Sequence, residues 1–137
     1  MSETHRLGDL QLAIMRTLWR QGEATVADVH AALYERRGLA LTTIATMLRK
    51  MEQKGVVRHR VDGRQFIYRP TVHEQDVQRT MIGDLVERLF DGDAKALLTH
   101  LVSEGEIDAE ELAELQELVA DRQGRRGGAE RSAGGVE

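Results

Sequence analysis

The sequence predicts a mainly α-helical protein with one small β-hairpin. We expect three helices and the hairpin within residues 1–71, a helical arm over residues 72–123 and a disordered tail over residues 124–137. Apolar residues recur at three- and four-residue spacing through most of the chain, which is typical of amphipathic helices. An Asp-Gly pair between two short strand-like segments indicates the hairpin. The charge also changes sign, from +5 over residues 1–73 to −10 over residues 74–123.

The first two helices have recognisable starts and ends. A helix is predicted over residues 8–21 because apolar residues repeat at i, i+4 and i+8, and Gly22 would end it. These apolar residues are Leu10, Ile14 and Leu18. Thr25 and Asp28 have the spacing of a capping box, which predicts a second helix over residues 26–36. Its buried stripe would consist of Val26, Val29 and Leu33.

The stretch "LTTIATMLRKMEQKG", residues 41–55, predicts a third helix with an unusual outer face. At about 100° per residue, one side of this helix is apolar. That side carries Ile44, Met47, Leu48 and Met51. The opposite side carries small residues, hydroxyls, an amide and two cations, namely Thr42, Ala45, Thr46, Arg49, Lys50 and Gln53. Gly55 fits the left-handed position just past the helix end.

The stretch "VVRHRVDGRQFIYRP" predicts the hairpin, with Asp62-Gly63 as a two-residue type I′ turn. This turn would pair Val61 with Arg64, His59 with Phe66 and Val57 with Tyr68. One face of the hairpin would then be apolar and pack on the helices; it would gather Val57, Val61, Phe66 and Tyr68. The other face would gather Arg58, Arg60, Gln65 and Arg69 around Ile67. Pro70 would end the hairpin, because proline cannot extend a central strand.

Three helices followed by a basic hairpin, in about 65 residues, are typical of a winged helix-turn-helix domain. In such domains the second helix of the pair enters the DNA major groove. Short hydroxyl side chains let that helix approach the bases, and cations contact guanine or phosphate. The candidate DNA-binding residues are Thr42, Thr43, Thr46, Arg49, Lys50, Arg58, Arg60 and Arg64. Taken singly, the threonines could instead cap the helix, and the cations could be solvated surface or protection of an edge strand.

Two stretches carry a resemblance to a known family: "LGDLQLAIMRTLWRQGEATVADVHAAL" and "LALTTIATMLRKMEQKGVVRHRVDGRQFIYRP". They resemble the penicillinase-repressor family (BlaI/MecI type, with the copper-responsive CopY branch) over roughly residues 7–120. The resemblance implies a homodimeric winged-helix transcriptional repressor that binds an operator of dyad symmetry, as in antibiotic resistance regulation. It places the threonines and cations of residues 42–50 in the recognition helix and the three hairpin arginines in the wing.

The chain departs from this family at two points. Copper-branch members bind metal through C-terminal cysteines; this chain has no cysteine, which excludes copper sensing through thiolates. In the β-lactam branch, a membrane-bound sensor protease inactivates the repressor by cutting an Asn-Phe bond. The corresponding pair here is His100-Leu101. The resemblance therefore implies a sensor protease as a partner, with a different bond at the expected cleavage site.

The acidic half carries apolar stripes on three short helices, which we expect over about residues 74–90, near residues 97–102 and after Asp108. About 50 residues in short helices cannot close a core by themselves. A second copy of the chain would supply the missing surface with two-fold symmetry. The residues expected at this dimer interface are Leu85, Leu89, Leu97, Leu101, Leu112, Leu115 and Val119.

Other classes of function find less support in the sequence. The five histidines have no metal-ligand spacing, and neither a phosphate-binding loop nor a nucleophile elbow occurs, so we expect neither an enzyme nor a cofactor. No signal peptide or membrane span is recognisable, which predicts a cytoplasmic protein without membrane insertion. Two alternatives stay open. One is a winged-helix protein-interaction module, which would carry an apolar anchor on the third helix. The other is a ligand-responsive regulator of another winged-helix family.

Overall fold

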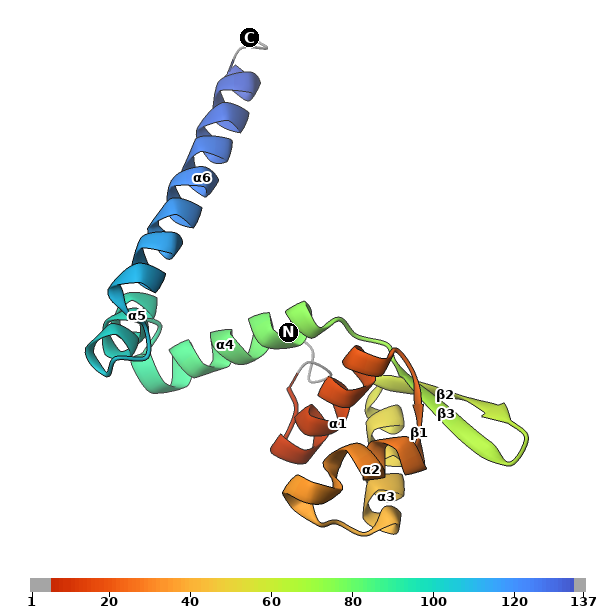
Figure 1. Cartoon of the computed structure of the whole chain (residues 1–137). Helices are drawn as coiled ribbons and strands as arrows, with labels where there is room; N and C mark the ends of the chain where they lie inside the picture. Colours follow the sequence, from red (N-terminus) through yellow and green to blue (C-terminus); the bar gives the residue numbers. More distant parts are fainter. Residues whose placement is uncertain (1–5, 135–137) are drawn as a thin grey trace. The chain divides into compact units, whose positions relative to one another are not determined.

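The computed structural model describes residues 6–134, except for the side chains of residues 35–37 and 125–134. The chain divides into two compact units within α4, between Leu85 and Val86. Figure 1 shows the elements in order. They are α1 Asp9–Gln21, β1 Ala24–Thr25, α2 Val26–Arg37, α3 Leu41–Lys54, β2 Val57–Asp62, β3 Gln65–Pro70, α4 Glu74–Phe90, α5 Ala94–Ser103 and α6 Ala109–Gly134.

The first unit is a winged helix-turn-helix domain with its own core, as predicted. Helices α1, α2 and α3 pack together, and the β2–β3 hairpin extends from them (Figure 1). The core side chains lie at the spacings expected from the sequence. Fully buried are Ile14, Met15, Leu18, Val29, Ile44, Leu48, Met51, Val56, Val57, Tyr68 and Val77. Burial of one such aliphatic side chain stabilises the fold by about 1.5–3 kcal/mol, so this cluster holds the domain together.

The predicted helix boundaries are confirmed by their caps. Thr25 Oγ1 accepts a hydrogen bond from the Asp28 amide at 3.1 Å, and Asp28 Oδ2 accepts one from the Thr25 amide at 3.0 Å. This capping box starts α2. Gly55 ends α3 with a φ of 93°, a left-handed conformation that costs glycine little. The start of α2 and the end of α3 are therefore set by local sequence.

The hairpin forms where the sequence predicts it, but the predicted register is wrong. Asp62 pairs with Gln65 and His59 with Tyr68, so the two turn residues are Gly63 and Arg64. Gly63 is at a φ of 63° and Arg64 is not at positive φ, the pattern of a type II′ turn, which needs a glycine only at its first position. The predicted type I′ turn at Asp62-Gly63 would have required positive φ at the aspartate as well.

The register error does not change which residues share a face of the hairpin. The partner of each residue moves by two positions, and side chains alternate with a period of two. Burial differs along the apolar face, however. Val57 and Tyr68 at the base are buried, whereas Val61 and Phe66 nearer the tip are 62% and 42% exposed. The expectation that the whole face packs on the helices therefore holds only at the base.

A third strand, β1, was not predicted. Its two residues, Ala24 and Thr25, pair with Tyr68 and Ile67 of β3, giving the antiparallel order β1-β3-β2. A two-residue strand has no alternation that a sequence pattern can detect. By pairing with β3, it fixes the base of the wing to the start of α2.

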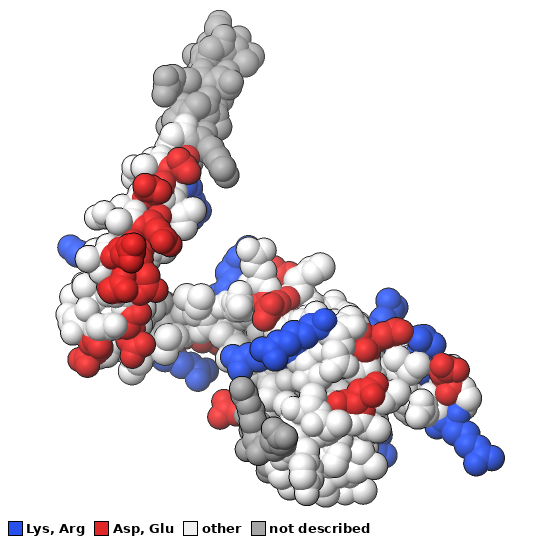
Figure 2. Space-filling view, viewed as in Figure 1, with Lys and Arg blue, Asp and Glu red and all other residues white. Residues whose placement is uncertain are grey.

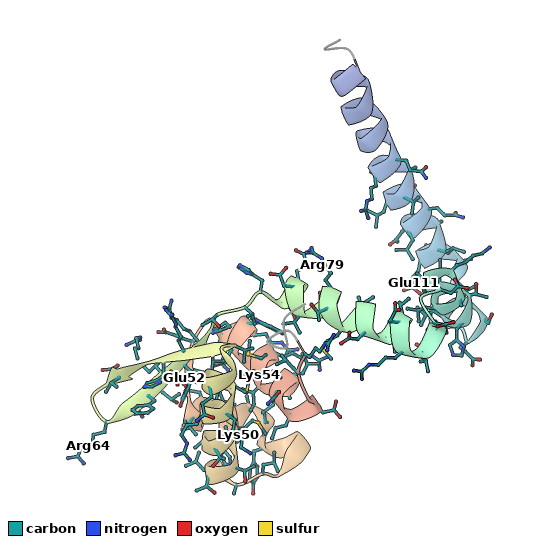
Figure 3. The ribbon with its side chains drawn as sticks, turned by 180° about the vertical axis from the view of Figure 1, so that it is seen from behind. Lys50, Glu52, Lys54, Arg64, Arg79 and Glu111 are labelled. Atoms are coloured by element: carbon teal, nitrogen blue, oxygen red, sulfur yellow. The ribbon has the colours of Figure 1, made fainter. Side chains whose placement is uncertain are left out.

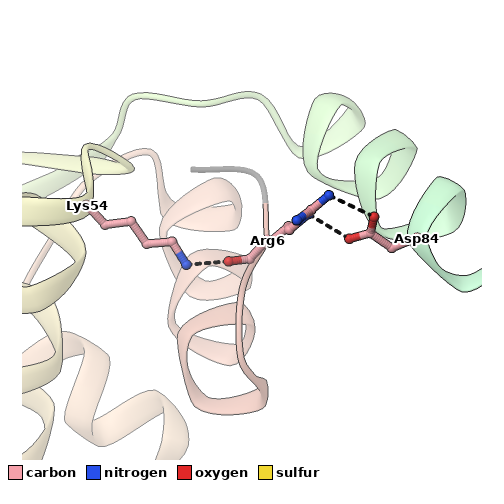
Figure 4. A network of polar contacts seen from close by, with 3 residues as sticks. All are labelled: Arg6, Lys54 and Asp84. Carbon is pink, nitrogen blue, oxygen red and sulfur yellow. Dashed lines mark hydrogen bonds and ion pairs between the residues drawn. The ribbon is translucent and has the colours of Figure 1, made fainter. Parts of the chain in front are cut away.

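The first unit extends into α4, beyond the boundary expected at residue 71. Val77 and Thr80 of α4 are buried. Arg6 donates to both carboxylate oxygens of Asp84, Nε to Oδ2 at 2.9 Å and Nη2 to Oδ1 at 3.2 Å. Lys54, at the end of α3, donates to the backbone carbonyl of Arg6 (Figure 4). These contacts join the start of α4 to the winged helix.

The second unit contains the end of α4 together with α5 and α6. Asp91 and Gly92 end α4 as predicted, both at positive φ. Asp108 and Glu111 form the predicted capping box of α6, with amide-to-carboxylate distances of 3.2 and 2.8 Å. No described side chain of residues 86–124 is buried.

The last helix is longer than expected. The sequence predicts a disordered tail from residue 124, whereas α6 continues to Gly134; residues 135–137 lie outside the described part of the chain. Adding a residue to an existing helix gains a hydrogen bond without the cost of nucleation. The glycines weaken that gain by about 1 kcal/mol each without preventing helix formation.

Candidate nucleic-acid interface

The outer face of α3 is accessible over the length that the sequence predicts. Ile44, Leu48 and Met51 are fully buried, which turns the opposite side of the helix outward. Each of the five α3 candidates is exposed: Thr42, Thr43, Thr46, Arg49 and Lys50. The structure also answers the question of capping, because α3 begins after Ala40 without a side-chain cap. Neither threonine is the N-cap, so both hydroxyls lie within the first turn.

Arg49 lies along this face rather than across it. Its Nη2 donates to Thr46 Oγ1 at 3.4 Å, one helical turn earlier. Lys50 lies beside it on α3 (Figure 3). A guanidinium group held along a helix with short side chains is suited to approach a base edge or a phosphate, because no bulky residue keeps the backbone away.

The three candidate arginines of the hairpin, Arg58, Arg60 and Arg64, are all exposed, but the structure does not cluster them. Arg58 lies near the hairpin base, where it lines a hollow with Glu52 and Arg69. Arg60 lies in the middle of β2. Arg64 is in the turn and points away from the domain (Figure 3). The wing therefore presents positive charge along its whole length, with Arg64 farthest from the helices.

Arg60 has an acidic partner that the sequence analysis missed. Its Nη2 lies 2.8 Å from Glu23 Oε1, in the connection between α1 and β1. The hydrogen bond and the charge of Arg60 lower the pKa of Glu23, and Glu23 raises the pKa of Arg60. Thirty-seven residues separate the two, so no local pattern could have revealed the pair. If Arg60 binds a DNA phosphate through the same nitrogen, its contact with Glu23 has to break.

A second acidic residue connects α3 to the wing. Glu52 Oε1 lies 2.6 Å from His59 Nδ1, and the His59 ring stacks on Phe66 with centroids 4.1 Å apart. Tyr68 is buried beneath them; burial and the charge of Glu52 raise the pKa of its hydroxyl. These contacts hold the hairpin in place relative to α3. Glu52 and His59 belong to different elements, and no sequence pattern predicted their contact.

The residues expected at a dimer interface are accessible in this single chain. Leu85, Leu89, Leu115 and Val119 are 43%, 68%, 39% and 56% exposed, whereas Leu97, Leu101 and Leu112 are half-buried. Leu118, 63% exposed, was not anticipated. Asp and Glu side chains crowd along α5 and α6, whereas Lys and Arg appear at the far end of the hairpin (Figure 2). The two charge regions predicted from the sequence thus belong to different elements.

The expected cleavage position lies inside a helix. His100 and Leu101 are both within α5, and the His100 ring packs near Phe90 with centroids 6.3 Å apart. His100 is exposed and Leu101 is half-buried. A helical peptide bond does not fit an extended protease cleft, so cleavage here requires α5 to unwind locally.

The described residues contain neither a metal-binding cluster nor a membrane-spanning helix. No group of three or more His, Asp or Glu side chains is arranged to hold a metal ion within residues 6–134. Over the same part of the chain, no helix has the length and apolar content needed to cross a bilayer.

Comparison with known proteins gives consistent results. The family model described as penicillinase repressor matches residues 7–121. The transcriptional regulator BlaI of Mycobacterium tuberculosis is 36% identical over 130 residues, covering 93% of this chain and 92% of the relative. The penicillinase repressor of Bacillus licheniformis is 23% identical over 126 residues, covering 92% of this chain and 98% of the relative.

A solved structure is also similar to part of the chain. It contains the monomeric form of Bacillus licheniformis BlaI in complex with the blaP half-operator. The similarity covers 56% of this chain and 93% of that chain, at 29% identity and a TM-score of 0.48. The two relatives from Mycobacterium tuberculosis and Bacillus licheniformis are named as a transcriptional regulator and a repressor.

Proposed function

The chain belongs to the penicillinase repressor family, and from this premise we propose that it is a homodimeric transcriptional repressor that occupies a dyad-symmetric operator. The single observation that carries the proposal is the outer face of α3. In a chain of this family, this face presents hydroxyls and cations, and the hairpin beside it carries four exposed arginines, Arg58, Arg60, Arg64 and Arg69. A repressor acts at the promoter, so we place the protein in the cytoplasm.

Each element has a distinct part in the proposed complex. The start of α3 enters the major groove, where Thr42, Thr43 and Thr46 lie close to base edges or thymine methyl groups. Arg49 and Lys50, further along, reach guanine or phosphate. Arg58, Arg60 and Arg64 contact backbone phosphates, which supplies affinity without reading sequence.

The second unit joins two such domains. Its exposed leucines cover one another in a dimer and leave the acidic side chains in solvent. Two-fold symmetry presents two recognition helices about 34 Å apart, one turn of duplex. Acidic helices that point away from the phosphates avoid the repulsion that the same charge would cause against DNA.

Release from the operator completes the proposal. An inducing signal, transmitted by a membrane-bound sensor protease, would cut the chain in its C-terminal region. Cutting at His100-Leu101 would separate α6 from the DNA-binding domain and so remove residues Leu112, Leu115 and Val119 from the dimer interface.

Gel-shift titrations of arginine variants test the DNA contacts. The duplex is the one protected by the protein in footprinting upstream of its own gene. Arg49→Ala should weaken binding by about 1–3 kcal/mol and relax preference at one position if the side chain contacts a base edge. Arg58→Ala should weaken all duplexes alike and reduce the salt slope by about 1. Arg79→Ala is the control, because Arg79 is 74% exposed on α4, outside the interface.

The outcomes separate the parts of the proposal. Unchanged affinity for Arg49→Ala or Arg58→Ala refutes the role of that residue. If the unaltered protein binds no duplex even at low salt, the proposed function itself is wrong.

A further inference from the structure

A groove lies between α3 and the wing, with a volume of about 510 Å³. Leu41, Ala45 and Arg49 line one side; their four-residue spacing places them along one edge of α3. Arg64, Phe66 and Tyr68, from the turn and β3, line the other side. Thr25, Val26 and Ala27, at the start of α2, also line the groove. The groove is therefore bordered by the two elements that carry the proposed DNA contacts and by the start of α2.

The lining of the groove is largely apolar, and two of its large side chains are accessible. Leu41 is 48% exposed and Phe66 is 42% exposed, whereas Ile44, Leu48 and Met51 of the same helix as Leu41 are fully buried. Leu41 begins the recognition helix, where the sequence otherwise has hydroxyls. Exposed leucine and phenylalanine side chains on opposite sides of one groove are available to contact a bound molecule.

The charged residues of the groove are both cations, which favours an anionic molecule as its occupant. Arg49 and Arg64 flank the apolar lining from opposite sides, and no acidic side chain lines the groove. Cations beside an apolar surface complement a polymer in which anionic groups alternate with apolar ones. The sugar–phosphate backbone of DNA is such a polymer, since each phosphate is followed by a deoxyribose with no hydroxyl at C2′.

The position of the groove favours the same occupant. When α3 lies in the major groove and the hairpin contacts the backbone beside it, one strand must pass between the two elements. The groove lies between them.

Building on the proposed function, we infer that this groove seats one sugar–phosphate strand of the operator. Leu41 and Phe66 contact the deoxyribose faces, and Arg64 contacts an adjoining phosphate. A 2′-hydroxyl at the seated nucleotides would face apolar carbon and lose its water partners without gaining a hydrogen bond. Leu41 and Phe66 thereby become determinants of selectivity for deoxyribose.

A ribonucleotide scan of the footprinted operator tests this inference. Single ribonucleotides replace deoxyribonucleotides along one strand, and the dissociation constant is measured for each duplex. The unaltered protein should lose affinity by about tenfold at one or two adjacent positions per half-site. In Leu41→Ala and in Phe66→Ala, the loss at those positions should fall below about threefold, because water can reach the hydroxyl.

Two controls address the obvious confounding effects. Val61→Ala removes another exposed apolar side chain from the same hairpin, outside the groove, and should keep the tenfold loss. A 2′-fluoro nucleotide has the ribose pucker without the hydroxyl donor, and should bind better than the ribonucleotide at the seated positions.

Each other result overturns the inference. If the all-deoxy duplex binds tightly and no single ribonucleotide weakens binding, the groove assignment is wrong but the proposed function stands. The groove assignment is also wrong if Leu41→Ala and Phe66→Ala both keep the tenfold loss at the same positions. Unchanged DNA affinity together with weaker self-association in those variants would assign the groove to a second copy of the chain. Failure to bind the all-deoxy duplex would overturn the proposed function as well.

Discussion

The two units of this chain use the same local structural devices but differ in what they bury. Each contains a helix that starts with a capping box, Thr25 with Asp28 in the first and Asp108 with Glu111 in the second. The first unit closes a core of 14 buried apolar residues. In the second, no described side chain of residues 86–124 is buried. Local signals are therefore sufficient to form both sets of helices, but only the first unit has enough apolar contact to stand alone.

The largest expected effect contrasts a core leucine with an arm leucine. Leu48→Ala should lower the free energy of unfolding of the first unit by about 2–5 kcal/mol, because it leaves a cavity at a fully buried site. Leu89→Ala, at a site 68% exposed, should change it by no more than about 0.5 kcal/mol. Urea titration followed by Trp19 fluorescence measures both. Equal losses in the two variants would contradict the assignment of the core to the first unit alone.

The next effect concerns self-association through the second unit. Leu115→Lys should raise the dimer dissociation constant by about tenfold or more, because it buries an unpaired charge in the proposed interface. Glu114→Gln, at the neighbouring exposed position, changes the net charge by the same amount and should leave association nearly unchanged. Sedimentation equilibrium at several concentrations distinguishes them. Equal dissociation constants for Leu115→Lys and the unaltered protein would place the interface elsewhere.

A smaller effect tests whether the start of α4 belongs to the first unit. Asp84→Asn removes the two-point contact with Arg6 and should cost about 0.2–1 kcal/mol, the range for partly exposed ion pairs. It should also speed hydrogen exchange in α4 around Val77 and Thr80. Asp76→Asn, whose partner Arg79 lies 3.6 Å away on the same helix, is the matched control. If both variants exchange alike, the start of α4 is not tied to the winged helix.

The smallest effect is the pH dependence of the Glu23–Arg60 pair. Arg60 lowers the pKa of Glu23 below its ordinary value of 4.5. The contact is therefore complete above that pH and is lost as the pH falls through the lowered pKa of the folded protein. Carboxyl chemical shifts of Glu23 followed from pH 7 to pH 2 should show the lowered midpoint, and Arg60→Gln should return it to the ordinary value. If the midpoint of Glu23 does not move in Arg60→Gln, Arg60 is not the cause of the lowered pKa.

The sequence predicted the local features of the fold well. Helix starts and ends followed from Thr25, Gly55 and Asp108, whose effects act within three or four residues. The fold class followed from apolar periodicity and the order of elements. The exposed face of α3 followed from the same periodicity, since burial of Ile44 and Leu48 fixes the opposite side.

Features that depend on distant residues were not predicted. The prediction of the hairpin register was wrong because Asp62-Gly63 and Gly63-Arg64 can both form a two-residue turn. Pairing along the strands decides between them. The partners of Arg60 and His59, Glu23 and Glu52, come from other elements. The groove between α3 and the wing exists only after the hairpin has packed beside Leu41 and Ala45.

Sedimentation velocity with a labelled operator duplex tests the central claim most directly, namely that the first unit binds DNA and the second unit pairs two chains. The full chain and a truncated form ending at Leu85 are compared, each with a duplex of one half-site and a duplex of two. We expect the full chain to sediment as a dimer that prefers the two-site duplex, and the truncated form to bind one half-site as a weak monomer. A monomeric full chain, a dimeric truncated form, or no binding to either duplex at low salt would contradict the account.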